Sequence, residues 1–85
     1  MHNWFVLWVM TGSEQDVRKR AACVPGMETA LAPMLALPYR RDGAWEYREQ
    51  VMIPGYVFLR CRMDSAIYHR VRSIPQVIGW LGGDS

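Results

Sequence analysis

The segment 56–63, YVFLRCRM, follows a Pro-Gly turn and alternates between two sets of side chains, as a β-strand does. One set, from Val57 to Met63, is entirely apolar. The other set begins with two aromatic rings, Tyr56 and Phe58, and ends with two arginines. A chain of 85 residues forms one domain with one modest core. Its fold must therefore accommodate a strand that carries large apolar side chains on both faces.

Two other segments carry helix signals. Ser13 is a natural N-cap after Thr11-Gly12, and acidic residues in the next turn suit the helix dipole. Pro25-Gly26 ends this helix. Asp64 or Ser65 caps the second helix. Apolar residues recur at helical spacing in both segments, so we expect helices over 13–24 and 65–74, each with one packing face.

Strand signals fill the remaining chain. Pro33 and Pro38 argue against a helix and against a central strand, and Asp42-Gly43 is a hairpin-turn signal. The predicted strands are a buried strand at 4–10, an irregular edge strand at 29–39, a half-exposed strand at 45–52, the strand at 56–63 and a final strand at 77–83.

This order of elements, β-α-β-β-β-α-β, predicts an α+β sandwich in which two helices pack on a mostly antiparallel four-stranded sheet. Two short helices can cover one sheet face and little more. We expect them to cover the apolar set that includes Val57 and Leu59, which leaves Tyr56 and Phe58 without cover. An uncovered aromatic patch on a small domain usually marks a docking site.

Basic residues gather in short clusters, although the net charge is only +2. Such clusters are most often solvated surface, and the functional interpretation is contact with nucleic-acid phosphates, which fixes orientation without reading sequence. The candidate nucleic-acid-binding residues are Arg18, Lys19 and Arg20 in the first helix, Arg40 and Arg41 at the hairpin, and Arg70 and Arg72 in the second helix.

The sequence carries no signal for catalysis, a metal or a cofactor. It has no glycine-rich phosphate loop, and His2 and His69 stand apart from any cluster with metal-ligand spacing. Cys23 and Cys61 are expected to stay reduced. No apolar run reaches the roughly 18 residues of a membrane span, and the start lacks the features of a signal peptide. We therefore expect a cytoplasmic, monomeric protein that is not an enzyme.

Ordered motifs run through the second half of the chain: Pro54-Gly55-Tyr56-Val57, Asp64 as an acidic cap, Tyr68-His69, Val71-Arg72-Ser73-Ile74-Pro75 and Val77-Ile78-Gly79-Trp80-Leu81-Gly82-Gly83. Their order resembles the NusG N-terminal (NGN) domain. The start, Trp4-Phe5-Val6-Leu7 followed by Thr11-Gly12, is similar as well. Leu31-Ala32-Pro33-Met34 is similar to the specialised paralogue RfaH, so a specialised antiterminator such as RfaH or LoaP is one expectation and the housekeeping factor is the other.

The resemblance implies a transcription elongation and antitermination factor. In that family the domain binds the clamp helices of the RNA polymerase β′ subunit, lies near the β-subunit gate loop and the DNA, and alters pausing or termination. For this chain we expect pausing or termination to be reduced. The RNA polymerase-binding residues that the resemblance implies are Trp8, Ile53, Pro54, Tyr56, Phe58 and Trp80. Met52-Ile53 stands where the family usually has Phe, and the first helix is shorter. The resemblance also implies that residues 1–85 are the NGN domain and that a C-terminal KOW domain belongs to the protein.

A second hypothesis comes from another class. Small α+β sheets bind RNA by stacking bases on surface aromatic rings. The chain is then an RNA-binding module that recognises a structured RNA through its basic helix and hairpin. The sequence leaves both hypotheses open.

Overall fold

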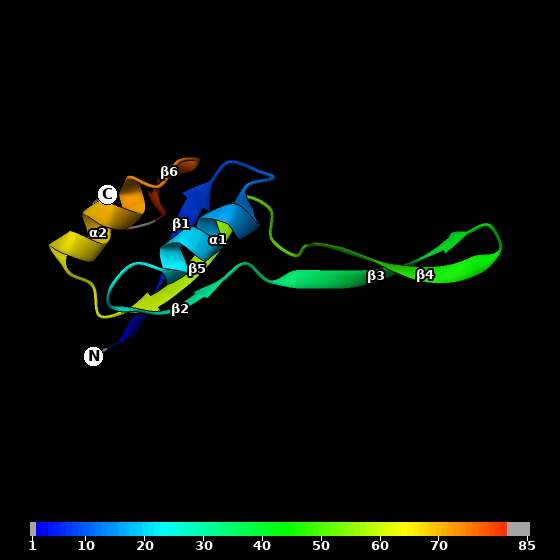
Figure 1. Cartoon of the computed structure of the whole chain (residues 1–85), viewed down its shortest axis with the longest axis horizontal. Coiled ribbons are helices and arrows are strands. Elements are labelled where there is room, and N and C mark those ends of the chain that lie inside the picture. The colour runs from blue at the N-terminus through cyan, green and yellow to red at the C-terminus, as the bar shows by residue number, and fades with distance from the viewer. Residues whose placement is uncertain (1, 82–85) are drawn as a thin grey trace.

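The computed structural model describes residues 2–81, which form six strands and two helices. The elements are β1 (Asn3–Val9), α1 (Glu14–Ala22), β2 (Met27–Leu31), β3 (Met34–Arg41), β4 (Ala44–Val51), β5 (Tyr56–Cys61), α2 (Ser65–Arg72) and β6 (Val77–Leu81) (Figure 1). The end of the predicted last strand, at 82–83, lies outside the described residues.

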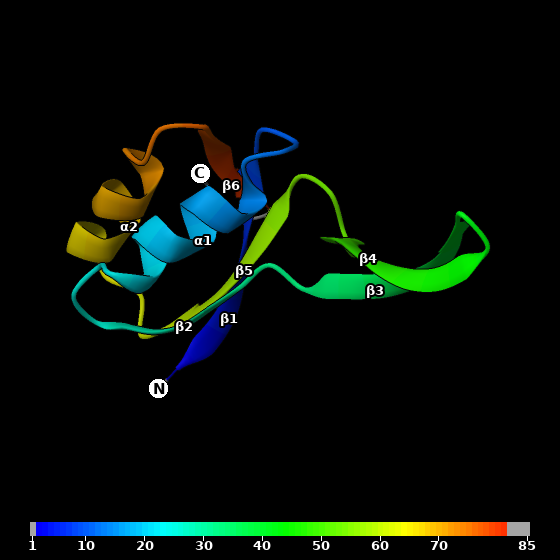
Figure 2. The same ribbon diagram turned by 45° about the vertical axis from the view of Figure 1, so that its right-hand side comes forward.

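Four strands form the main sheet in the order β2-β5-β1-β6, and every neighbouring pair is antiparallel. Both helices lie on one side of this sheet (Figure 2). Their inward residues pack on the apolar set of β5, as predicted: Val57, Leu59 and Cys61 are fully buried. The core beneath the helices comprises Leu7, Val9, Val17, Ala21, Ala30, Ala32, Val57, Leu59, Cys61, Ile67, Val71 and Trp80. The α+β class with a four-stranded antiparallel sheet is thereby confirmed.

The prediction of a single edge strand over 29–39 was wrong. The chain makes two strands there, because β2 ends at Leu31 and β3 begins at Met34. Pro33 lies in the break, where it has no N–H to donate to a ladder and its carbonyl accepts a hydrogen bond of 2.7 Å from the Met52 amide. Only β2 joins the main sheet.

Strand β3 pairs instead with β4, in a hairpin that projects from the globular part of the molecule (Figure 1). The projection makes the molecule 53 Å long but only 23 × 21 Å across. Asp42 and Gly43 both adopt positive φ, of 50° and 80°, which is the backbone of a tight hairpin turn and confirms the Asp-Gly signal.

The main sheet and its helices are built from two β-α-β halves, β1-α1-β2 and β5-α2-β6, although the sequence shows no internal repeat. In each half the helix is followed by a turn that contains a proline, Pro25 in the first half and Pro75 in the second. The residue after each proline has a positive φ, which is 91° at Gly26 and 76° at Gln76. Ala30 and Trp80 occupy equivalent buried positions on the following strands. The halves therefore share their backbone plan and differ in how they fill the core.

The two helices start differently. Asp64 caps α2, because its carboxylate accepts a hydrogen bond of 2.7 Å from the Ile67 amide. Ser13 is the N-cap residue of α1, as predicted, but its side chain makes no capping hydrogen bond. Within the described residues, neither helix is long and apolar enough to cross a membrane.

Candidate docking face

The sheet surface opposite the helices, here called the open face, carries a continuous apolar patch. Its residues alternate along each strand with the fully buried Leu7, Val57 and Leu59, so they point away from the core. Strand register places them in three rows across the sheet: Tyr56, Trp8 and Gly79; Leu31, Phe58, Val6 and Leu81; Thr29, Arg60 and Trp4.

These side chains meet solvent despite their size. Trp4 is 52% exposed, Trp8 47%, Leu81 50% and Leu31 44%, while Tyr56 and Phe58 are half-buried among them. The β3-β4 hairpin points away from this surface and does not cover it (Figure 2). The described chain therefore leaves a row of aromatic and aliphatic side chains in water, which is the property of an interaction site and not of a core.

Trp80 was predicted to belong to this surface, and that prediction was wrong. Trp80 lies opposite Leu7 in the β1–β6 register and is buried on the helix side. Its ring stacks on Tyr68 of α2, with centroids 5.5 Å apart, and meets Phe5 edge-on at 6.2 Å. The residues of β6 on the open face are its two neighbours, Gly79 and Leu81. Because 77–81 is apolar at almost every position, alternation alone does not indicate which set faces the helices.

Trp4 was not predicted to take part, yet it is the more exposed of the two tryptophans on the open face. Its signal was present in the sequence: Trp4 and Trp8 are four positions apart in one strand, and therefore share a face. Ile53 and Pro54 are exposed in the turn before β5, next to Tyr56. We call these two residues the rim of the open face; their part in binding stays a prediction.

The rim is anchored from beneath. Gly55 has a φ of 87°, which favours glycine, and its carbonyl accepts a 2.9 Å hydrogen bond from the Val9 amide. The Gly55 amide donates to the buried carboxylate of Glu14 at 2.8 Å. Burial alone would raise the pKa of Glu14, but hydrogen bonds from the backbone amides of Gly55, Glu14 itself and Gly12 lower that pKa below its usual value.

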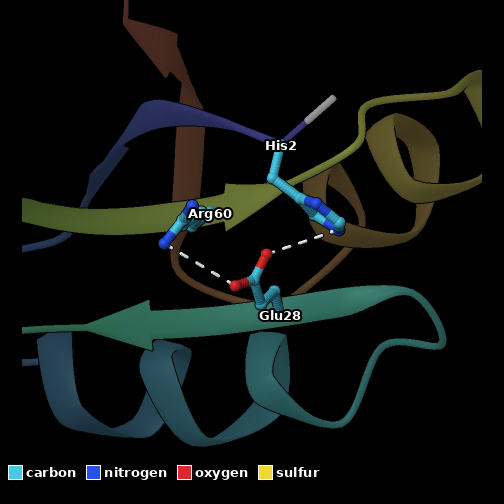
Figure 3. A network of polar contacts seen from close by, with 3 residues as sticks. All are labelled: His2, Glu28 and Arg60. Carbon is cyan, nitrogen blue, oxygen red and sulfur yellow. Dashed lines mark ion pairs between the residues drawn. The ribbon is translucent and has the colours of Figure 1, made fainter.

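An ion-pair network closes the third row at one end of the open face (Figure 3). The carboxylate of Glu28 lies 3.7 Å from the Arg60 guanidinium and 3.3 Å from the His2 imidazole. All three side chains are accessible to solvent, so the network contributes little stability. It gives this end of the apolar surface a charged border.

The basic clusters do not converge on one site. Lys19 and Arg20 are exposed on α1, where Arg18 instead donates a 2.8 Å hydrogen bond to Gln15. Arg40 and Arg41 lie at the tip of the projecting hairpin, away from α1 (Figure 1).

On α2, the Arg70 side chain is exposed, whereas Arg72 reaches the border of the sheet. The Arg72 guanidinium donates to the Ile78 carbonyl and lies 3.5 Å from where a Cβ on Gly79 would stand. Arg72 therefore borders the open face, and Arg70 does not share that contact.

These features define a class of protein: a small α+β domain that presents one bare apolar sheet face. Between His2 and Leu81, no three His, Cys, Asp or Glu side chains are grouped to hold a metal ion. Cys23 and Cys61 are free thiols, and burial, helped by the negative charge of Asp64, raises the pKa of Cys61.

Comparison with known proteins identifies the family. Residues 2–85 match the family described as "Transcription termination factor nusG". The chain is 42% identical over 89 residues to the transcription termination/antitermination protein NusG of Yersinia pestis, covering 96% of this chain and 49% of that protein. It is 32% identical over 90 residues to NusG of Vibrio parahaemolyticus, with the same coverage. The chain belongs to the NusG family of transcription termination and antitermination factors, as its motifs predicted.

Solved structures agree on the fold. NusG of Thermotoga maritima matches with a TM-score of 0.71 at 22% identity, over 100% of this chain and 48% of that chain. A chain of the MjSpt4:Spt5 complex matches with a TM-score of 0.63 at 15% identity, over 98% of this chain and 51% of that chain. The present chain thus spans about half the length of the proteins it resembles. Membership in a family of transcription factors confirms the prediction that it is not an enzyme.

Proposed function

We propose that the open face docks on the clamp helices of the β′ subunit of bacterial RNA polymerase and thereby reduces pausing or termination. The observation that carries the proposal is the row of exposed aromatic and aliphatic side chains across a sheet that its own helices leave bare. Membership in the NusG family supports the choice of partner. The domain would act as a cytoplasmic monomer.

The contact would centre on three rings. Trp8, Tyr56 and Phe58 lie on adjoining rows of the open face, and Trp4 extends them toward Arg60. Ile53 and Pro54 at the rim would border the helices, and Arg72 would meet them at the opposite edge. Large rings in the centre of an interface typically contribute about 2 kcal/mol or more each, which is about 30-fold in affinity. Docking of this kind would hold the clamp closed.

The exposed side of α2 would face the β-subunit gate loop. His69 and Arg70 are solvent-accessible there, whereas Tyr68 is half-buried against Trp80. His69 and Arg70 are therefore two exposed side chains of this helix that would meet a second polymerase surface.

The test is binding of the chain to core RNA polymerase, with the double variant Tyr56→Ala and Phe58→Ala. Tyr47→Ala is the matched control, because Tyr47 is an even more exposed aromatic ring, at 75%, but lies on the hairpin. We expect the double variant to lose at least about 30-fold in affinity with little dependence on salt, and the control to bind like the parent. Equal binding by all three proteins would contradict docking through the open face.

One observation favours nucleic-acid contact at the hairpin as a second function. Arg40 lies directly opposite Trp45, and Tyr47 shares their face of the hairpin; the two rings are 68% and 75% exposed. On the other face, Tyr39 donates to Glu46 at 2.6 Å and lies under Arg48. Within the described chain Arg40 has no such partner. An exposed cation beside two exposed rings suits a phosphate and stacked bases.

The second function is tested by RNA and DNA binding across a range of salt concentrations. Replacing Arg40 and Arg41 by Ala should weaken binding and reduce the salt slope by about one for each phosphate that is no longer neutralised. Replacing Arg18, Lys19 and Arg20 by Ala measures the contribution of α1 in the same assay. If both variants bind nucleic acid as the parent does, at every salt concentration, neither cluster is a nucleic-acid site.

A further inference from the structure

We infer that Glu14 is a positioning residue of the docking face: its carboxylate holds the Pro54-Gly55 turn, and through the turn it sets the rim and Tyr56. The inference rests on the proposed docking function. Glu14 belongs to α1, on the opposite side of the sheet from the open face, so it would act on the partner only through the turn.

The geometry singles out this carboxylate. Glu14 is 2% exposed, and among residues 2–81 it is the one charged side chain that is buried. One oxygen accepts from the Gly12 amide and the other from the Gly55 amide, both at 2.8 Å. Gly55 lies 41 residues away in the sequence. A buried carboxylate is costly unless it is hydrogen-bonded in this way.

The second half of the fold supplies an internal comparison. Asp64, the acid at the start of α2, uses its carboxylate to accept from an amide of its own helix. Glu14, the acid at the start of α1, makes a bond to its own amide and to Gly12, and then reaches outward to a turn that leads into the central strand β5. Capping of α1 does not require the hydrogen bond from the Gly55 amide to Glu14, so this bond contributes something other than the start of the helix.

The Pro54-Gly55 turn lies directly before the first row of the open face, so docking would require one defined conformation of the turn. Gly55 is bonded on both sides, by its carbonyl to the Val9 amide and by its amide to Glu14. Tyr56 follows immediately and pairs with Trp8 in the first row of the open face. Glycine at positive φ has many alternative conformations. If the bond to Glu14 is removed, the turn occupies the docking conformation for a smaller fraction of time, and affinity falls by that fraction.

The experiment compares Glu14→Gln with Val71→Ala in the full chain. Glutamine keeps the volume and one acceptor oxygen, but its amide group would face an N–H donor. Val71 is fully buried on the other helix, so its truncation costs stability without touching the turn. At a temperature where both variants are folded, we expect Glu14→Gln to bind polymerase about tenfold more weakly than the parent. We expect Val71→Ala to bind within about twofold of the parent. Equal affinity of a folded Glu14→Gln variant and the parent would overturn the inference.

A measurement on the unmutated chain applies even if Glu14→Gln does not fold. In a pH titration followed by NMR, the Gly55 amide proton should shift with the same midpoint as the Glu14 carboxyl carbon, together with resonances of Tyr56. If the chemical shift of the Gly55 amide proton does not change as Glu14 titrates, the proposed coupling between Glu14 and the turn is refuted. The docking proposal has a separate test, the binding of the Tyr56 and Phe58 double variant to polymerase. If that test contradicts docking, the NMR result for Glu14 and Gly55 still stands.

Discussion

Two tryptophans on neighbouring strands should behave in opposite ways when truncated, because the sheet places them on opposite faces. Trp80 is 9% exposed and packed between Tyr68 and Phe5, so Trp80→Ala removes two ring contacts and opens a cavity in the core. Truncations of this kind cost about 3–5 kcal/mol. Trp8 is 47% exposed, and its truncation leaves no closed cavity. We expect Trp8→Ala to cost about 1–2 kcal/mol of unfolding free energy.

A domain of 85 residues is expected to be stable by roughly 4–13 kcal/mol, so the Trp80 substitution removes a large share of its stability. Urea unfolding followed by far-ultraviolet circular dichroism measures the difference, since tryptophan fluorescence changes with the substitution itself. With a slope near 1 kcal/mol per M, each kcal/mol moves the midpoint by about 1 M. Trp80→Phe, which keeps a ring in the core, provides a folded variant if Trp80→Ala does not fold.

Polymerase binding should show the reverse order. Trp8→Ala should bind about 30-fold more weakly, and the folded Trp80 variant should bind like the parent. The reasoning is refuted if Trp8→Ala unfolds as readily as Trp80→Ala. It is also refuted if a folded Trp80 variant binds as weakly as Trp8→Ala, because the ring would then belong to the docking face after all.

Three further predictions concern stability. The lowered pKa of Glu14 contributes stability that is present above the usual glutamate pKa and is lost as pH falls through the lowered value; Glu14→Gln should flatten this acid limb in urea titrations from pH 7 to pH 2. Gln76→Gly should raise the unfolding free energy by about 1 kcal/mol by relieving a φ of 76°. Gly26→Ala should lower it, because alanine is strained at a φ of 91° and its Cβ would also stand 3.0 Å from the Ile67 side chain; an unfolding free energy that falls in Gln76→Gly would contradict backbone strain at that position. Replacing residues 36–49 by Asn-Gly should leave the thermal midpoint of the main sheet unchanged within a few degrees, since the hairpin projects from the core; a large drop would show that it packs on the sheet.

Local signals in the sequence determined much of this molecule. The alternation in 56–63 separated the buried Val57 and Leu59 from Tyr56 and Phe58 without reference to any partner strand. The Asp42-Gly43 turn, the Asp64 cap and both helices were predictable for the same reason, because each depends on residues a few positions apart. The family was recognisable from motifs of similarly short range.

Tertiary packing decided the rest. The apolar run of β6 fits either face, and only its register with β1 sends Trp80 to the helices and Gly79 to the open face. The split of 29–39 depends on which partner each half finds, β5 for β2 and β4 for β3. Glu14 meets Gly55 across 41 residues, a contact that no local pattern encodes, because these partners become neighbours only when β1 has paired with β5 and α1 has packed on the sheet.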